Sequence, residues 1–406
     1  MEARDSAAWT AGQKGVVGLV ALALVLDGLD AQALGLAIPA LIRDWGVTRA
    51  DLTPIAAASL TAMALGATFG GWVGDRIGRR RALIGSLVLF GLATGLAART
   101  HGLVAFGLLR SAAGLGLGAT LPTASALIAE FTPVRHRSIG MSIAMLSQPV
   151  GSMVAGLLAA ALLESAGWRS LFLIGGAAPL ALALFYLWQL PESPGYLAAS
   201  ETGAPRASLA ALLYRERRHD SLLAWIACFL SLLALYTVLS WAPAMLAAEK
   251  FPLSFTGTAI ASFSVGGIVG SLACGLLIRR LGSRGTQFVI GGVGVTVALV
   301  LCVLFGMGLA TPARVGVLMA FVGFSAAGTQ TTLYALSAHL YPTWLRATGF
   351  GALLGIGRLG AVASSWVGAT TLDLGGAVAF FVLFGVAITS ATLACTAIRR
   401  PVLPLS

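Results

Sequence analysis

Residues 16–38 read VVGLVALALVLDGLDAQALGLAI, an apolar run long enough to cross a bilayer, with Asp27 and Asp30 in its middle. A carboxylate at that depth costs about 2.5–3.5 kcal/mol on insertion scales, so it needs a partner, a proton or a water-filled cavity. The two side chains lie on adjacent parts of one helix face, and two like charges that close cannot both ionise cheaply. The pair is therefore a candidate for binding and releasing protons inside a membrane. The structural alternative is that one aspartate caps a helix break at Gly28 or pairs statically with an arginine.

The composition indicates a polytopic membrane protein. The 406-residue chain is 58% hydrophobic and 10% charged, with a mean hydropathy of +0.91, whereas soluble domains carry about 25% charged residues. The net charge of +11 does not predict nucleic-acid binding, because the arginines gather in short loops between apolar runs. The four cysteines fall inside apolar runs without metal-ligand spacing, so we expect no metal site. The chain has no phosphate-loop or nucleophile-elbow motif, so neither an ATP-driven pump nor an enzyme is expected.

Twelve apolar runs predict twelve transmembrane helices and an all-α membrane fold. They cover residues 16–38, 52–74, 82–98, 103–130, 138–163, 170–190, 221–248, 256–278, 286–309, 313–338, 349–371 and 375–397. Of the 26 Lys and Arg residues, eighteen fall on one side of this arrangement and six on the other. Arg110 and Arg358 lie within spans. Because cytoplasmic loops are enriched in Lys and Arg, the bias predicts that both termini are cytoplasmic.

The chain reads as two halves, residues 1–190 and 221–406, joined by a hydrophilic cytoplasmic linker at 191–220. The halves repeat each other, because the segment 71–80 after the second span matches the segment 275–284 after the eighth. A second match aligns Ala129-Glu130, Pro133, Arg137 and Gly140 with Ala338-His339, Pro342, Arg346 and Gly349. Duplicated halves in a twelve-span protein are typical of a transporter that rocks about a site at the membrane midplane.

These segments resemble a known family. The segment 71–80 resembles the loop motif of the major facilitator superfamily, and Leu190–Pro194 resembles the end of the sixth span in many members. Within the superfamily, the chain is similar to the aromatic acid:proton symporters in Asp27–Asp30, Arg110 with Gly114–Gly118, Tyr341-Pro342, Arg346–Gly349 and Gly355–Gly360. The continuation to Ala33, with Gln330 and Leu333–Leu336, resembles hydroxyphenylpropionate-type transporters. One departure is Arg279, which stands where the first half has Asp75, so a salt-bridge or capping role of Asp75 is not duplicated.

The resemblance implies a major-facilitator-type fold, with twelve transmembrane helices in two pseudo-symmetric six-helix halves. It implies alternating-access, proton-coupled uptake of an aromatic carboxylate of the hydroxybenzoate or hydroxyphenylpropionate type. We expect a monomer in the bacterial inner membrane, with protons as coupling ions and no cofactor. The alternatives are a carrier of another substrate, such as a sugar, a short organic acid or an exported drug, and a non-transporting receptor. The receptor interpretation predicts a sizeable soluble domain, and the longest hydrophilic stretch is only the linker.

Asp27 and Asp30 are the main proton-coupling candidates. Glu130 and His339 occupy equivalent positions at the cytoplasmic ends of spans four and ten, and a histidine side chain can titrate near neutral pH. They are candidates for gating or proton release. The alternative is a pair of interfacial polar caps that bind loop arginines.

Arg110 and Arg358 are the candidates for binding a substrate carboxylate, because a guanidinium presents a planar donor fork that stays charged. The alternative for Arg110 is a permanent ion pair with one of the aspartates. An aromatic ligand would stack on Trp or Tyr and would need a polar partner for a hydroxyl. The further candidates for substrate binding, each with helix packing as its alternative, are Gln330, Tyr334, Trp241 and Gln148.

The loop after the second span is a candidate gate, because glycine permits a tight turn and the charges can lock one conformation by pairing with helix ends. The alternative is that the arginines only fix membrane orientation. The gating candidates are Asp75, Arg76, Gly78, Arg79 and Arg80, with Arg137 and Arg346 in the matching later loops.

Overall fold

The apolar runs form long α-helices in a computed structural model that describes residues 9–133, 137–193, 218–340, 346–400 and 402. Ten of the described helices are long and apolar enough to cross a membrane. The chain divides into two units, Met1–Ala204 and Pro205–Ser406. Most of the predicted linker, residues 194–217, lies outside the described residues.

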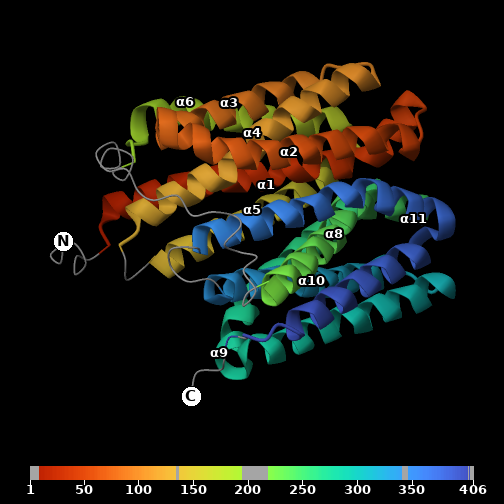
Figure 1. The fold of residues 1–406 in the computed structure, drawn as a ribbon. Helices are drawn as coiled ribbons and strands as arrows, with labels where there is room; N and C mark the ends of the chain where they lie inside the picture. Colours follow the sequence, from red (N-terminus) through yellow and green to blue (C-terminus); the bar gives the residue numbers. More distant parts are fainter. Residues whose placement is uncertain (1–8, 134–136, 194–217, 341–345, 401, 403–406) are drawn as a thin grey trace. The chain divides into compact units, whose positions relative to one another are not determined.

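The first unit is built from six helices that run alongside one another (Figure 1). Helix α1 begins at a capping box, in which Thr10 and Gln13 bond each other's backbone N–H, and it ends at a left-handed Gly46. A second capping box, between Thr48 and Asp51, starts α2. The helices are α1 (Ala11–Trp45), α2 (Arg49–Ile77), α3 (Arg79–Ala97), α4 (Leu103–Phe131), α5 (Arg137–Leu162) and α6 (Trp168–Gln189).

The second unit contains α8 (Arg218–Ala248), α9 (Leu253–Gly306), α10 (Pro312–Leu340) and α11 (Arg346–Thr396). At 54 residues, α9 would be about 80 Å long if it were straight, against a bilayer core of about 30 Å. It breaks at Gly282, and α11 breaks at Gly375 and Gly376. Both helices therefore fold back as hairpins (Figure 1). Each supplies two of the predicted spans, so the described residues form the twelve helical segments of the predicted fold.

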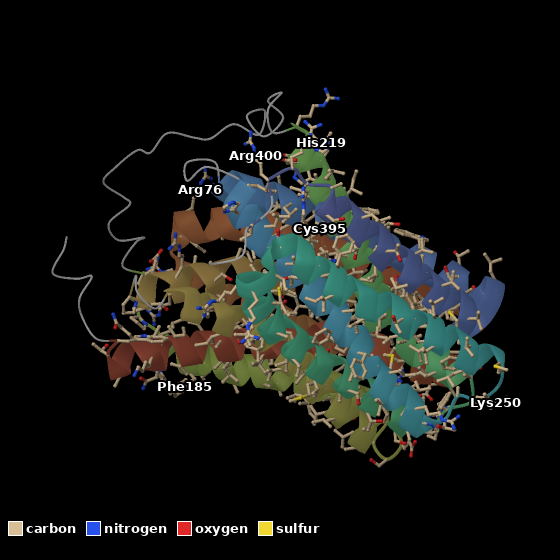
Figure 2. The ribbon with its side chains drawn as sticks, turned by 90° about the horizontal axis from the view of Figure 1, so that it is seen from below. Arg76, Phe185, His219, Lys250, Cys395 and Arg400 are labelled. Carbon is tan, nitrogen blue, oxygen red and sulfur yellow. The ribbon has the colours of Figure 1, made fainter. Side chains whose placement is uncertain are left out.

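The predicted internal repeat is present in the backbone. Gly78 ends α2 with φ 99°, and Gly282 divides α9 with φ 69°, so each supplies a left-handed turn that side chains disfavour. Helices α4 and α10 are both 29 residues long and begin and end at equivalent residues of the repeat. Figure 2 shows His219 and Arg400 at one end of the second unit and Lys250 at its other end.

Glycines let the helices of each unit pack backbone to backbone. A Cβ at Gly118 of α4 would collide with the Met63 carbonyl of α2, and one at Gly114 would collide with the Ser59 carbonyl. The second unit repeats this packing, because a Cβ at Gly323 of α10 would collide with the Phe263 carbonyl of α9. Small residues at such crossings are the usual way in which membrane helices approach closely.

Candidate functional site

The two aspartates of α1 are fully buried and have different partners. The Asp30 carboxylate accepts a hydrogen bond from Arg110 Nη1 of α4 at 3.0 Å, in an ion pair whose members are both at most 2% exposed. The Asp27 carboxylate accepts a hydrogen bond from the Gln148 side-chain amide of α5. One carboxylate is therefore paired with a permanent cation, whereas the other accepts a hydrogen bond from a neutral amide.

Several elements enclose the Asp30–Arg110 ion pair. Arg110 also donates to Thr94 Oγ1 of α3 at 3.3 Å and to the Asp30 carbonyl at 3.4 Å. Its guanidinium lies 5.5 Å from the Phe172 ring centroid of α6. A Cβ at Gly175 of α6 would lie 3.3 Å from Asp30 Oδ1, so this glycine leaves room for the carboxylate. The structure thus joins Arg110, a candidate for substrate binding, to an aspartate.

Glycines also set the contact between α1 and α5 that brings Gln148 to Asp27. A Cβ at Gly28 would collide with the Gln148 carbonyl, and a Cβ at Gly151 would collide with the Val25 carbonyl. The two backbones therefore approach on both sides of the Asp27–Gln148 hydrogen bond. Gln148, which the sequence predicts as a substrate-binding residue, therefore lies at this helix contact and donates to Asp27.

In the second unit, Arg358 of α11 is half-buried and donates from Nη1 to the Tyr236 hydroxyl of α8 at 3.5 Å. It forms no ion pair with any residue that the structure describes. Gln330 of α10 accepts a hydrogen bond from Ser231 Oγ at 3.0 Å and donates to Cys228 Sγ at 3.7 Å. The Tyr334 hydroxyl faces Gln330 and lies within electrostatic range of Arg358. Three of the predicted substrate-binding residues, Arg358, Gln330 and Tyr334, are thus gathered in one cluster.

Trp241 lies elsewhere on α8. Its indole is fully buried and packs on Gly368, further along α11 than Arg358. Its Nε1 has no hydrogen-bond partner within the described part of the chain. The structure therefore does not bring Trp241 to the arginine.

Equivalent glycine contacts inside each unit show which residues of α1 and α8 correspond in the internal repeat. A Cβ at Gly151 would collide with the Val25 carbonyl and the Leu29 amide. A Cβ at Gly360 would likewise collide with the Phe229 carbonyl and lie 3.2 Å from the Leu233 amide nitrogen. Val25 thus corresponds to Phe229, and Leu29 to Leu233. By the same spacing, Ser231 occupies the position of Asp27 and Ala234 that of Asp30.

Three residues of these contacts were not predicted as site residues: Ser231, Cys228 and Thr94. Extending the repeat through span seven would have marked Ser231, because it falls two residues after the counterpart of Val25. Nothing in the sequence marks Thr94 or Cys228, since their roles arise from helix packing.

The loop-end candidates form a second cluster in the first unit. Arg79 forms an ion pair with Glu130, which also accepts a hydrogen bond from Ser193. The Arg80 backbone N–H donates to Glu192 Oε1 at 3.0 Å, and a Cβ at Gly78 would collide with the Glu192 carboxylate. Glycine at position 78 is thus favoured by its left-handed φ, and it also leaves room for the Glu192 carboxylate.

The remaining loop candidates are at the periphery or undescribed. Arg76 is exposed at the end of α2, where Figure 2 labels it. His339 is also exposed and makes no hydrogen bond to a described residue, so it does not share the paired environment of Glu130. The side chains of Asp75, Arg137 and Arg346 lie outside the described residues. Over the same described residues, no cluster of His, Cys, Asp and Glu could hold a metal ion.

Residues 20–365 match the Major Facilitator Superfamily. The chain belongs to that superfamily. As a superfamily member it is a membrane transporter and not an enzyme.

Relatives of the chain within the superfamily carry aromatic acid names. It is 34% identical over 393 residues to the 4-hydroxybenzoate transporter PcaK of Pseudomonas aeruginosa, which covers 89% of this chain and 86% of that protein. It is 32% identical over 363 residues to the 3-(3-hydroxy-phenyl)propionate transporter of Escherichia coli, covering 88% and 87%.

A solved structure agrees in fold. The crystal structure of a D-xylose-proton symporter matches with a TM-score of 0.75 at 18% identity, covering 96% of this chain and 98% of that one. At that identity the likeness concerns the fold alone.

Proposed function

We propose that this chain is a proton-coupled importer of aromatic monocarboxylates. One observation carries the proposal: Arg358, on a membrane-spanning helix, contacts a tyrosine hydroxyl and has no carboxylate partner among the described residues. A guanidinium in a membrane interior needs an anionic partner, and a bidentate carboxylate is the best match for its donor fork. The names of the relatives, a 4-hydroxybenzoate and a hydroxyphenylpropionate transporter, support an aromatic acid as that partner.

In this proposal Arg110 does not bind the substrate, because it is already paired with Asp30. The Asp30–Arg110 ion pair holds α1 against α4, and Asp27 carries the proton. Asp27 suits that role because its amide partner, Gln148, can bond either the ionised or the protonated carboxyl group. Gln148 thus positions the proton carrier.

Proton coupling also has an energetic reason. A monoanion that enters a cell with a negative interior climbs about 2.3 kcal/mol per 100 mV of membrane potential. One proton that enters with the anion cancels its charge and removes that cost. The proposal includes a monomer in a bacterial inner membrane, both termini in the cytoplasm, and no cofactor besides protons.

We further propose that the Arg79–Glu130 ion pair, with its Ser193 contact, closes one end of the first unit in one transport state. The ion pair must break when that end opens. His339 has no matching partner among the described residues, so this gate belongs to the first unit.

The direct test is uptake of radiolabelled 4-hydroxybenzoate by purified protein in proteoliposomes. We expect accumulation above the equilibrium level when the outside is acidic, and loss of accumulation when an ionophore removes the gradient. Arg358→Gln should abolish uptake, and Arg358→Lys should retain little, since an ammonium lacks the bidentate fork. Accumulation of D-xylose with no response to any aromatic acid would refute the proposal in favour of another substrate class.

A further inference from the structure

A hydrogen-bonded network of three side chains in the second unit has no role in the proposal so far. Ser231 Oγ donates to Gln330 Oε1 at 3.0 Å, and Gln330 Nε2 donates to Cys228 Sγ at 3.7 Å. Ser231 and Cys228 are fully buried, and Gln330 is 7% exposed. The three side chains join α8 to α10 inside a membrane-spanning unit.

The hydrogen bond between Gln330 and Cys228 is the weaker of the two bonds in this network. A carboxamide has two N–H donors, whereas a thiol sulfur is a weak acceptor. The Gln330 amide also faces the Tyr334 hydroxyl, so its two N–H groups are directed at a phenol oxygen and at the weaker thiol acceptor. An oxygen brought to this place by a ligand would therefore replace the sulfur with a net gain. Ser231, which uses its proton on Gln330, still has lone pairs with which to accept.

The same junction holds the carboxylate-binding arginine. A Cβ at Gly357 would lie 2.6 Å from Cys228 Sγ, so α11 packs directly on the thiol. The next residue is Arg358, whose guanidinium is within electrostatic range of Cys228 and of the Tyr334 hydroxyl. A ligand bound to Arg358 through its carboxylate would thus lie beside the Gln330 amide and a tyrosine ring.

We propose that Gln330, Ser231 and Cys228 form a subsite for the ring hydroxyl of an aromatic acid whose carboxylate binds Arg358. The inference rests on the proposed function and deepens it. The ligand hydroxyl accepts a hydrogen bond from Gln330 Nε2 and donates its own to Ser231 Oγ. Cys228 is the partner that Gln330 takes when no hydroxyl is present.

The Cys228 thiol determines how strongly the subsite discriminates between acids with and without a ring hydroxyl. A site whose polar groups are left unpaired by the wrong ligand rejects that ligand by about 10⁴–10⁵-fold. Here an acid without the hydroxyl leaves Gln330 bonded to Cys228, so no buried donor is stranded. The preference for 4-hydroxybenzoate over benzoate should then be about ten-fold, the ratio that one net hydrogen bond supplies.

Substitutions of Cys228 test this in opposite directions. The measurement is the ratio of the inhibition constants of benzoate and 4-hydroxybenzoate against uptake of labelled 4-hydroxybenzoate in proteoliposomes. Cys228→Ser gives Gln330 a good internal acceptor, so the ratio should fall toward one. Cys228→Ala removes the thiol acceptor and leaves one Gln330 N–H unpaired when benzoate binds, so the ratio should rise by about ten-fold. Gln330→Met removes the donor, and the ratio should again approach one.

The matched control is Cys274→Ser, which alters a buried thiol of the same unit that contacts Thr332 instead of Gln330. Its ratio should equal that of the unaltered protein. Equal shifts in Cys228→Ser and Cys228→Ala, or an unchanged ratio in Gln330→Met, would overturn the subsite while leaving aromatic acid transport intact. An unaltered protein that transports neither acid would overturn the proposed function and the subsite with it.

Discussion

The Asp30–Arg110 ion pair allows a quantitative prediction about stability. The variants are Asp30→Leu, Arg110→Met and the combination of both. The two side chains are 0% and 1% exposed, and the charged atoms lie 3.0 Å apart. At an effective dielectric constant of about 20, the Coulomb energy at that distance is about 5.5 kcal/mol. Removing one member of a buried pair typically costs about 3–5 kcal/mol, because the other charge is stranded.

The two single variants should differ. A guanidinium stays charged, so Asp30→Leu leaves a buried charge whose remaining partners are Thr94, a backbone carbonyl and the Phe172 ring. Its expected cost is about 3–5 kcal/mol. Asp30 can take a proton and become neutral, so Arg110→Met should cost less, about 1–3 kcal/mol. The double variant replaces the pair by apolar side chains of similar length and should be more stable than Asp30→Leu alone.

The assay is thermal unfolding of the purified protein in one detergent at one lipid content. For a domain of about 150–250 residues, each kcal/mol shifts the midpoint by about 2–4 °C, so Asp30→Leu should lower it by about 6–20 °C. The double variant should recover much of that loss. The control is Arg43→Met, which removes a largely exposed neighbour contact of 3.6 Å to Asp44 and should cost at most about 1 kcal/mol.

Additivity would refute this reasoning. If the double variant loses the sum of the two single losses, the side chains do not interact, and the ion pair is not what orders this part of the unit. A loss in Asp30→Leu no larger than the loss in Arg43→Met would refute it equally.

Three further predictions use the same preparations. Asp27→Asn should still exchange labelled for unlabelled acid but should not accumulate it under a proton gradient, as measured in paired counterflow and uptake assays; intact accumulation contradicts the role of Asp27 and of its partner Gln148. Gly28→Ala should lower stability by about 1–3 kcal/mol through its collision with α5, whereas Gly18→Ala, where nothing lies within 4 Å, should be neutral or slightly stabilising in the same melt. Arg358→Gln should leave the unfolding midpoint near that of the unaltered protein, because the change strands no carboxylate, and a drop as large as that of Asp30→Leu would show a structural ion pair instead.

Hydrophobic length and charge predicted most of the fold, because a bilayer permits few alternatives to a spanning helix. The run 103–130 became Leu103–Phe131, and the glycine-rich turn after the second span falls at Gly78. The glycine breaks divide α9 and α11 into two helical segments each, so these two long helices account for four of the predicted spans.

The partners of the site residues could not be predicted in the same way. Asp27 and Asp30 are three residues apart in one helix, and the sequence alone does not distinguish their partners. Their separation into an amide-bound and an arginine-bound carboxylate depends on which faces of α5 and α4 meet α1, and glycine contacts at Gly28 and Gly151 determine the first of these. The sequence left the choice open between a ligand and an ion-pair role for Arg110, and only the packing of α4 distinguishes them.

Charge balance connects the two proposed roles. With Asp30 and Arg110 neutralising each other, Asp27 and Arg358 are the remaining charges of the proposed machinery, and their sum is zero in the empty carrier. The sum is again zero when Asp27 holds a proton and Arg358 holds an anion, but a proton or an anion alone leaves one net charge within the membrane. At about 2.5–3.5 kcal/mol for such a charge, a singly loaded carrier is disfavoured about 100-fold relative to an empty or doubly loaded one. In Asp27→Asn only the anion-loaded carrier is neutral, which is why that variant should exchange its substrate and yet fail to accumulate it.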